Sequence, residues 1–181
     1  MRTLLAMLIV LALPVTAQEL SDRYQVFGEM AVTLDGTKMV LPIAFDLENK
    51  NSFAEIRPLY GKVRMLSVTG VTATDAGEWD APMIALVIQI SGSGKGTLMA
   101  IDLSEKGRSN AKRTVANIEF GSMDLPEFSI SEDGAVEFRF SGELVRTLVD
   151  SAYNQTLDEG QPPVKMIGTV SMIIPQAYRA N

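Results

Sequence analysis

The chain of 181 residues contains no cysteine and no histidine. Without histidine, it lacks the side chain that most often moves protons near neutral pH. The Ser–His–acid triad, the Cys–His pair and histidine metal sites are therefore excluded. Without cysteine, no disulfide supports the fold, so the hydrophobic core alone must hold it together. We therefore expect a protein that is not an enzyme and that binds no cofactor or metal ion.

Positive charge is also scarce. The chain has 16 Lys and Arg against 22 Asp and Glu, which gives a formal net charge of −6. An acidic protein repels the phosphates of nucleic acids and the headgroups of anionic lipids. Because the sequence contains no dense run of basic residues, we expect neither nucleic acid nor an anionic membrane surface as a partner.

One long hydrophobic run is present, at the N-terminus. Residues 1–17 combine Arg2, an apolar stretch too short to span a bilayer, and a small-residue motif that ends at Ala17. This pattern is typical of a secretory signal peptide that is cleaved before Gln18. We expect residues 18–181 to be one soluble domain, without a transmembrane segment, in a bacterial periplasm or outside the cell.

The rest of the chain alternates between apolar and polar residues with the period of a β-strand. The clearest example is 39–47, which follows an Asp35-Gly36 turn of the kind that joins hairpins. Within this strand Pro42 lacks an N–H, which predicts an edge position or a bulge. Residues 83–88 are apolar on both faces, which predicts a strand in the centre of a sheet.

Further short strands, separated by Gly, Asp and Asn, predict an all-β fold. It would be a single antiparallel β-sandwich or a closed β-barrel of about eight to ten strands, and the alternation fits both. Residues 141–157 fit a helix or a strand. We expect a strand to about Val149, bent by a bulge at Ser141-Gly142.

Several short motifs suggest ligand sites that the sequence does not establish. Ser91–Thr97 contains a Gly-Lys pair, but Gln89 stands where a phosphate-binding loop needs glycine. We interpret the segment as a hairpin turn. Acidic residues gather in the loop 73–82 and around Asp46. Their spacing does not match a known calcium loop, so we expect solvated acidic loops, and Ca²⁺ binding by 73–82 stays open.

Two aromatic residues are candidates for binding a partner or a ligand. Trp79 is the single tryptophan and falls in the polar loop 73–82, and Tyr60 falls in a turn that begins at Pro58. An exposed aromatic ring in a loop can anchor a partner. The alternative is that each ring folds back over the end of the core.

These observations favour an exported, non-catalytic binding or interaction module of the cell envelope. We expect it to recognise a protein or an envelope component through the loops 73–82 and 104–113. The first alternative is a carrier that holds a small lipophilic molecule in a barrel cavity. The second is a hydrolase that uses paired carboxylates, for which Glu137 and Glu143 are candidates. The oligomeric state stays open, because edge strands can pair between copies.

Overall fold

The computed structural model describes residues 19–107 and 111–179 and confirms an all-β fold. The predicted signal peptide, including Ala17 and Gln18, lies outside the described residues. In these two ranges no helix is long and apolar enough to cross a membrane. The strands are β1 (Tyr24–Leu34), β2 (Thr37–Asp46), β3 (Asn51–Ser52), β4 (Ala54–Tyr60), β5 (Val63–Ala73), β6 (Trp79–Ile90), β7 (Gly96–Ser104), β8 (Lys112–Asn117), β9 (Ser122–Ile130), β10 (Ala135–Val149), β11 (Gln155–Leu157) and β12 (Val164–Ile173), followed by the 3₁₀ helix η1 (Gln176–Tyr178).

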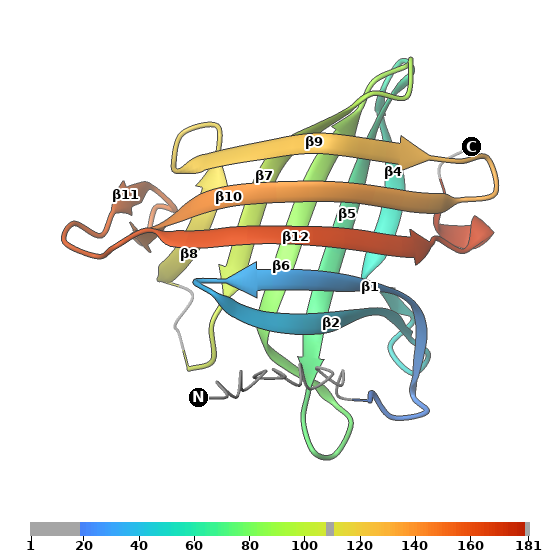
Figure 1. The fold of residues 1–181 in the computed structure, drawn as a ribbon, viewed down its shortest axis with the longest axis horizontal. Coiled ribbons are helices and arrows are strands. Elements are labelled where there is room, and N and C mark those ends of the chain that lie inside the picture. Colours follow the sequence, from blue (N-terminus) through green and yellow to red (C-terminus); the bar gives the residue numbers. More distant parts are fainter. Residues whose placement is uncertain (1–18, 108–110, 180–181) are drawn as a thin grey trace, which may run out of the picture.

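Twelve strands form one antiparallel sheet that folds over on itself. The prediction of eight to ten strands missed the shortest ones, β3 and β11, which have two and three residues. In Figure 1 a front half, made of β1, β2, β3, β9, β10 and β12, runs across a back half made of β4 to β8.

Strand β10 belongs to both halves. Its first part pairs with β9 and β12, and its last part pairs with β8. The predicted bulge at Ser141-Gly142 is wrong, because β10 stays in continuous register with β12 from Ala135 to Leu144. The register shift near this point places its extra residue in β9, between Asp124 and Glu127. At Gly142 an added Cβ would lie 2.7 Å from the Cδ1 atom of Ile101, so the two strands approach closely here. The prediction of a strand to Val149 is confirmed.

The sheet is not closed, but one residue links its two ends. The Phe53 N–H donates a hydrogen bond to the Ala44 carbonyl of β2 (2.9 Å). The Phe53 carbonyl accepts one from the Thr69 N–H of β5 (2.7 Å). Since β3 pairs with β2 and β4 pairs with β5, the chain crosses here from the front half to the back half. The result is a barrel-like sandwich.

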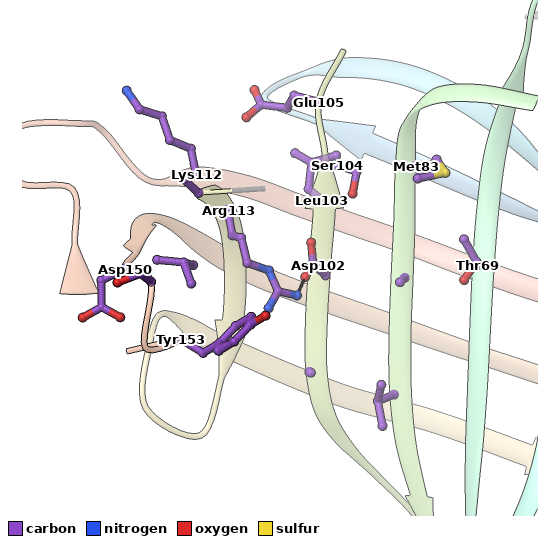
Figure 2. A pocket seen from close by; sticks show the side chains of 16 residues that line it. Thr69, Met83, Asp102, Leu103, Ser104, Glu105, Lys112, Arg113, Asp150 and Tyr153 are labelled. Atoms are coloured by element: carbon purple, nitrogen blue, oxygen red, sulfur yellow. Dashed lines mark hydrogen bonds and ion pairs between the residues drawn. The ribbon is translucent and has the colours of Figure 1, made fainter. Parts of the chain in front are cut away.

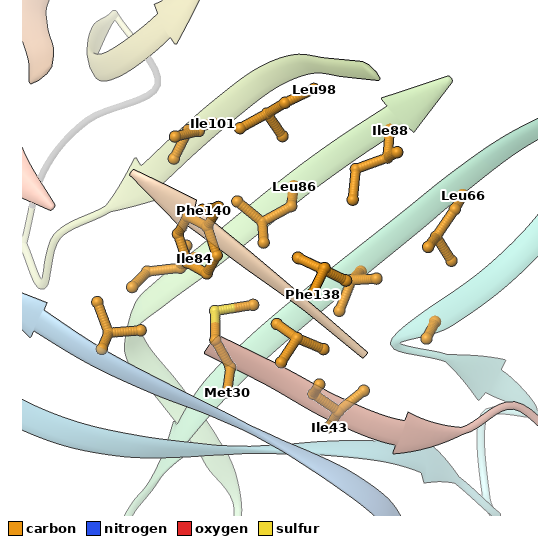
Figure 3. Close-up of a cluster of buried hydrophobic side chains, with 14 of the residues drawn as sticks. Met30, Ile43, Leu66, Ile84, Leu86, Ile88, Leu98, Ile101, Phe138 and Phe140 are labelled. Atoms are coloured by element: carbon orange, nitrogen blue, oxygen red, sulfur yellow. The ribbon is translucent and has the colours of Figure 1, made fainter. Parts of the chain in front are cut away.

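The core fills the space between the two halves. Strand β6 lies between β5 and β7, as predicted, and its inward-facing side chains are fully buried. From the front half, Met30, Phe138 and Phe140 meet them (Figure 3). The outward-facing Met83, Ala85 and Val87 of β6 are only half-buried. The apolar pattern on both faces therefore corresponds to one buried face and one face that no described element covers.

The hairpin turns contain residues that tolerate a positive φ angle. Asp35 and Gly36 adopt positive φ angles of 46° and 85°, and the Asp35 side chain accepts a hydrogen bond from the Lys165 N–H (2.8 Å). Gly94 has a φ of 83° in the turn between β6 and β7. The interpretation of Ser91–Thr97 as a hairpin turn is thus confirmed.

Three strands at the margins of the sheet each carry one proline: Pro42 in β2, Pro58 in β4 and Pro126 in β9. Each proline lies close to a register shift. Proline has no N–H to offer, and a bulge twists the edge away from a potential partner strand. The prediction of an edge position or a bulge at Pro42 is confirmed, and these edges are unsuited to pairing between copies.

We predict that the double substitution Pro58→Val and Pro126→Val promotes self-association, because it restores two edge N–H groups. Association should begin at roughly tenfold lower protein concentration than in the wild type, as measured by sedimentation velocity. Pro163→Val, in the loop between β11 and β12, serves as the control and should change nothing. Identical sedimentation of the edge variant and the wild type would show that these prolines do not protect the edges.

A candidate binding groove

The outer face of the back half carries an open groove of about 950 Å³. Its floor consists mostly of small side chains from neighbouring strands, including Thr69 of β5, Ala85 of β6 and Ala100 of β7. Thr69 lies beside Ala85, and Val87 lies beside Ala100. These side chains point away from the core because successive residues of a strand alternate between faces. The surface is hollowed at the centre of the floor because the side chains there are small.

One wall of the groove comes from β8 and from the turn between β10 and β11. Arg113 of β8 forms a salt bridge with Asp102 of β7. Figure 2 shows Arg113 reaching toward Asp102, with the Tyr153 ring beside them. Val149, the last residue of β10, also lines this side. The groove thus combines an apolar floor with an ion pair and an aromatic ring on its wall.

Tyr153 has an unusual backbone. Its φ angle is 64° and its side chain is 89% exposed. A bulky residue rarely adopts this left-handed conformation, which costs about 1–3 kcal/mol. The turn is held by Asp150, whose carboxylate accepts hydrogen bonds from the N–H groups of Ala152 (2.8 Å) and Asn154 (2.9 Å). Hydrogen bonds from Asn154 hold the pKa of Asp150 below its usual value, so the carboxylate stays ionised.

In comparisons with known proteins, no protein-family model matches the chain, and no curated protein has a significantly similar sequence. The interpretation of the groove therefore depends on its own geometry.

The two aromatic residues singled out in the sequence lie elsewhere. Trp79 is the first residue of β6 and does not lie in the loop, which corrects that placement. The residue is 44% exposed, and its ring meets that of Phe53 edge to face, with 6.4 Å between centroids. Tyr60 ends β4 and is 64% exposed. Neither residue lines the groove, and their roles in binding stay predictions.

Trp79 and Tyr60 cannot form one site. Trp79 pairs with Ala73 at one end of β5, and Tyr60 pairs with Val63 at the other. Ten residues of strand separate these ends, which corresponds to about 33 Å.

The loops 73–82 and 104–113, which the sequence suggested as recognition loops, are joined by an ion pair. The Lys106 ammonium lies 2.7 Å from an Asp80 carboxylate oxygen. This contact lowers the pKa of Asp80 and raises the pKa of Lys106, since each charge stabilises the other. Several described residues of the second loop and its flanks, among them Ser104 and Lys112, line the groove. The two loops therefore lie together at one end of it.

The two acidic clusters converge on Arg23. The Asp46 carboxylate accepts hydrogen bonds from Arg23 Nε (3.0 Å) and Nη2 (2.6 Å), and Glu78 accepts one from Arg23 Nη1 (3.0 Å). The Asp46 side chain is only 3% exposed and also accepts backbone N–H groups, including that of Asn49. These carboxylates therefore bind a guanidinium and secure the start of the domain. Within the described ranges, there is no group of three or more acidic side chains that could hold a metal ion.

The candidate catalytic carboxylates are far apart. Glu137 and Glu143 are exposed on β10 and are separated by six residues, which corresponds to about 20 Å along a strand. Glycoside hydrolysis needs carboxyl groups about 5–9.5 Å apart. This pair therefore does not suit that mechanism.

We predict that Asp46→Asn lowers the melting temperature by roughly 5–10 °C at neutral pH, because it leaves buried donors without a charged partner. Hydrogen bonds from Arg23 lower the pKa of Asp46 below its ordinary value of 3.8. The stabilisation is therefore present above that value and is lost as the pH falls through the folded-state pKa. The variant should lose this part of the pH dependence.

Calorimetry between neutral pH and about pH 3 measures both effects. Glu48→Gln is the control, because Glu48 also contacts Arg23 (3.1 Å) but is largely exposed. It should melt close to the wild type. Equal melting temperatures for Asp46→Asn and Glu48→Gln would contradict the assignment of Asp46 as the main anchor.

Proposed function

We propose that the chain is an exported, non-catalytic binding module whose groove receives a protein partner. The observation that carries this proposal is the strained, exposed Tyr153 at the wall of an apolar groove. Tyrosine and arginine dominate the binding energy of many protein interfaces, and here Tyr153 lies near Arg113. Retaining a bulky ring in the left-handed region is reasonable where the ring contacts a partner.

The outer face of β6 supports the proposal that a protein partner covers this side of the sheet. Strands that are apolar on both faces are usually buried on both faces. In β6, the inner face is covered by the core, and Met83, Ala85 and Val87 face the groove. A floor of small side chains leaves room for bulky apolar groups of a partner, and the rim pair Asp102–Arg113 supplies polar contacts.

The cellular location belongs to the same proposal. The pattern of residues 1–17 supports export to a periplasm or to the outside of the cell. The absence of cysteine and histidine supports a binding role over catalysis.

A second candidate function is transport of a small lipophilic molecule. The interior is filled by the core, so a ligand would have to use an outer hollow. A hollow of about 450 Å³ next to β1 and β2 is lined mainly by apolar residues, including Leu20, Val26, Val40 and Pro42. Native mass spectrometry distinguishes the two candidates, because a carried ligand adds a small mass to the protein and a protein partner adds a large one.

The test of the main proposal is photo-crosslinking in the cell. We expect a photoreactive phenylalanine analogue in place of Val87, on the groove floor, to capture one discrete protein. The same analogue in place of Thr169, exposed on the front half, is the control and should not capture that protein. Capture from both positions, or from neither, would contradict the groove as the binding surface.

We predict that Tyr153→Ala weakens affinity for the captured partner by roughly 30-fold or more, as loss of a hot-spot side chain does. Because the ring is exposed and alanine keeps the Cβ that bears the backbone strain, the melting temperature should stay close to that of the wild type. Tyr178→Ala removes an equal ring outside the groove and should leave affinity unchanged. Tyr60→Ala tests the earlier prediction for Tyr60, which lower affinity would support. Trp79→Ala tests the earlier prediction for Trp79: lower affinity with little loss of stability supports it, and unfolding with normal binding places Trp79 in the core.

A further inference from the structure

Charge is distributed unevenly along the back half. The segments 56–74 and 81–101 contain no Asp or Glu, although the protein is acidic overall. The basic residues of β4, of β5, of the turn between them and of the turn after β6 lie within these segments: Arg57, Lys62, Arg64 and Lys95. Positive charge therefore gathers at the end of the back half that holds the turn between β4 and β5. The acidic loop 74–78 lies at the other end of β5.

Two turns form this basic end. Figure 1 shows the turns β4–β5 and β6–β7 at the same end of the molecule, beyond the front strands. The turns lie against each other, since a Cβ added at Gly92 would be 2.9 Å from the Cβ of Lys62. We call residues 57–64 together with 91–95 the basic tip.

Most of the charge of the basic tip is uncompensated. Arg57 pairs with Glu55 (2.7 Å). Lys62, Arg64 and Lys95 form no salt bridge with any residue in the described ranges. Near the groove, in contrast, Asp102 pairs with Arg113 and Glu105 pairs with Arg146.

The basic tip also exposes apolar side chains. A register shift between Pro58 and Tyr60 places a bulge at Leu59. Leu59 is 47% exposed and Tyr60 is 64% exposed, at the extreme end of the hairpin. A bulge re-aims side chains, and here two consecutive residues face solvent. An aliphatic group next to a tyrosine, surrounded by lysine and arginine, is the chemistry that enters the interface of a lipid bilayer.

We propose that the basic tip docks on a bilayer that carries anionic lipid. Leu59 and Tyr60 enter the headgroup region, and Lys62, Arg64 and Lys95 contact the anionic headgroups. The net charge of −6 does not prevent this, because salt screens charges beyond about 8–10 Å. The acidic loop 74–78 lies about 33 Å away along β5. This site is separate from the groove and does not depend on the proposed partner.

Vesicle cosedimentation tests the proposal with the purified, processed protein. We expect binding to vesicles of phosphatidylcholine with phosphatidylglycerol at low salt. Vesicles of phosphatidylcholine alone should bind much less protein, and about 0.5 M salt should release it. The triple variant Lys62→Gln, Arg64→Gln and Lys95→Gln should bind on the order of 100-fold more weakly.

The matched control changes the net charge by the same amount at other sites. Lys38→Gln, Lys50→Gln and Lys165→Gln remove three exposed lysines outside the basic tip. This variant should bind as the wild type does. Equal loss in both triple variants, or no binding of the wild type to anionic vesicles, would overturn the proposal. Inorganic phosphate that competes at millimolar concentration would also overturn it, because the tip would then be a site for soluble anions.

A tryptophan reporter keeps the test independent of variant stability. Tyr60→Trp in a Trp79→Phe background places the single indole at the tip. Anionic vesicles that contain brominated lipid should quench this indole. In the wild type, Trp79 lies at the opposite end of β5 and should not be quenched. Quenching of Trp79 together with an unquenched reporter at position 60 would place the membrane contact elsewhere.

Discussion

The structure depends on the passage of β10 from the front half to the back half. This one strand pairs with β9 and β12 and then with β8, so both halves share a continuous ladder. Phe138, Phe140 and Leu144 of β10 lie in the core. With no disulfide available, this shared strand and the packing between the halves hold the fold together. The crossing also sets the position of the groove, because the turn that follows β10 carries Tyr153.

Local patterns accounted for most of the strands and turns. Alternation predicted β2, and a run that is apolar on both faces predicted the inner part of β6. The turn residues Asp35 and Gly36 predicted the first hairpin. Such signals are local, since they require only the period of a strand and the residues that accept positive φ. The strand at Trp79 was missed because acidic residues and Pro82 interrupt the alternation around it.

The functional candidates depend on contacts that no local pattern shows. Arg23 joins carboxylates from two distant loops, so the clusters looked like solvated loops or calcium ligands in the sequence. Tyr153 sits within a segment that fitted a helix and a strand equally well. Its importance follows from a left-handed backbone and from the pairing of β10 with β8. The basic tip was hidden for the same reason, because net charge does not show that two turns place their cations together.

Together, these features describe a rigid β scaffold with two separate surfaces. The groove offers an apolar floor and a pre-positioned aromatic ring, which favours recognition of one partner. The basic tip points from the end of the back half, so a membrane contact there leaves the groove accessible. Our proposals for the groove and for the basic tip are compatible, because one protein could bind a partner and a bilayer at the same time.

The most direct test of the groove is methyl NMR on the methionine-labelled protein with the partner captured by cross-linking. Met83 lies in the groove, Met30 and Met166 lie in the core, and Met39 lies in the front half. The account predicts that the partner shifts or broadens the Met83 signal and leaves the other three nearly unchanged. An unchanged Met83 signal, with Met39 perturbed, would contradict it.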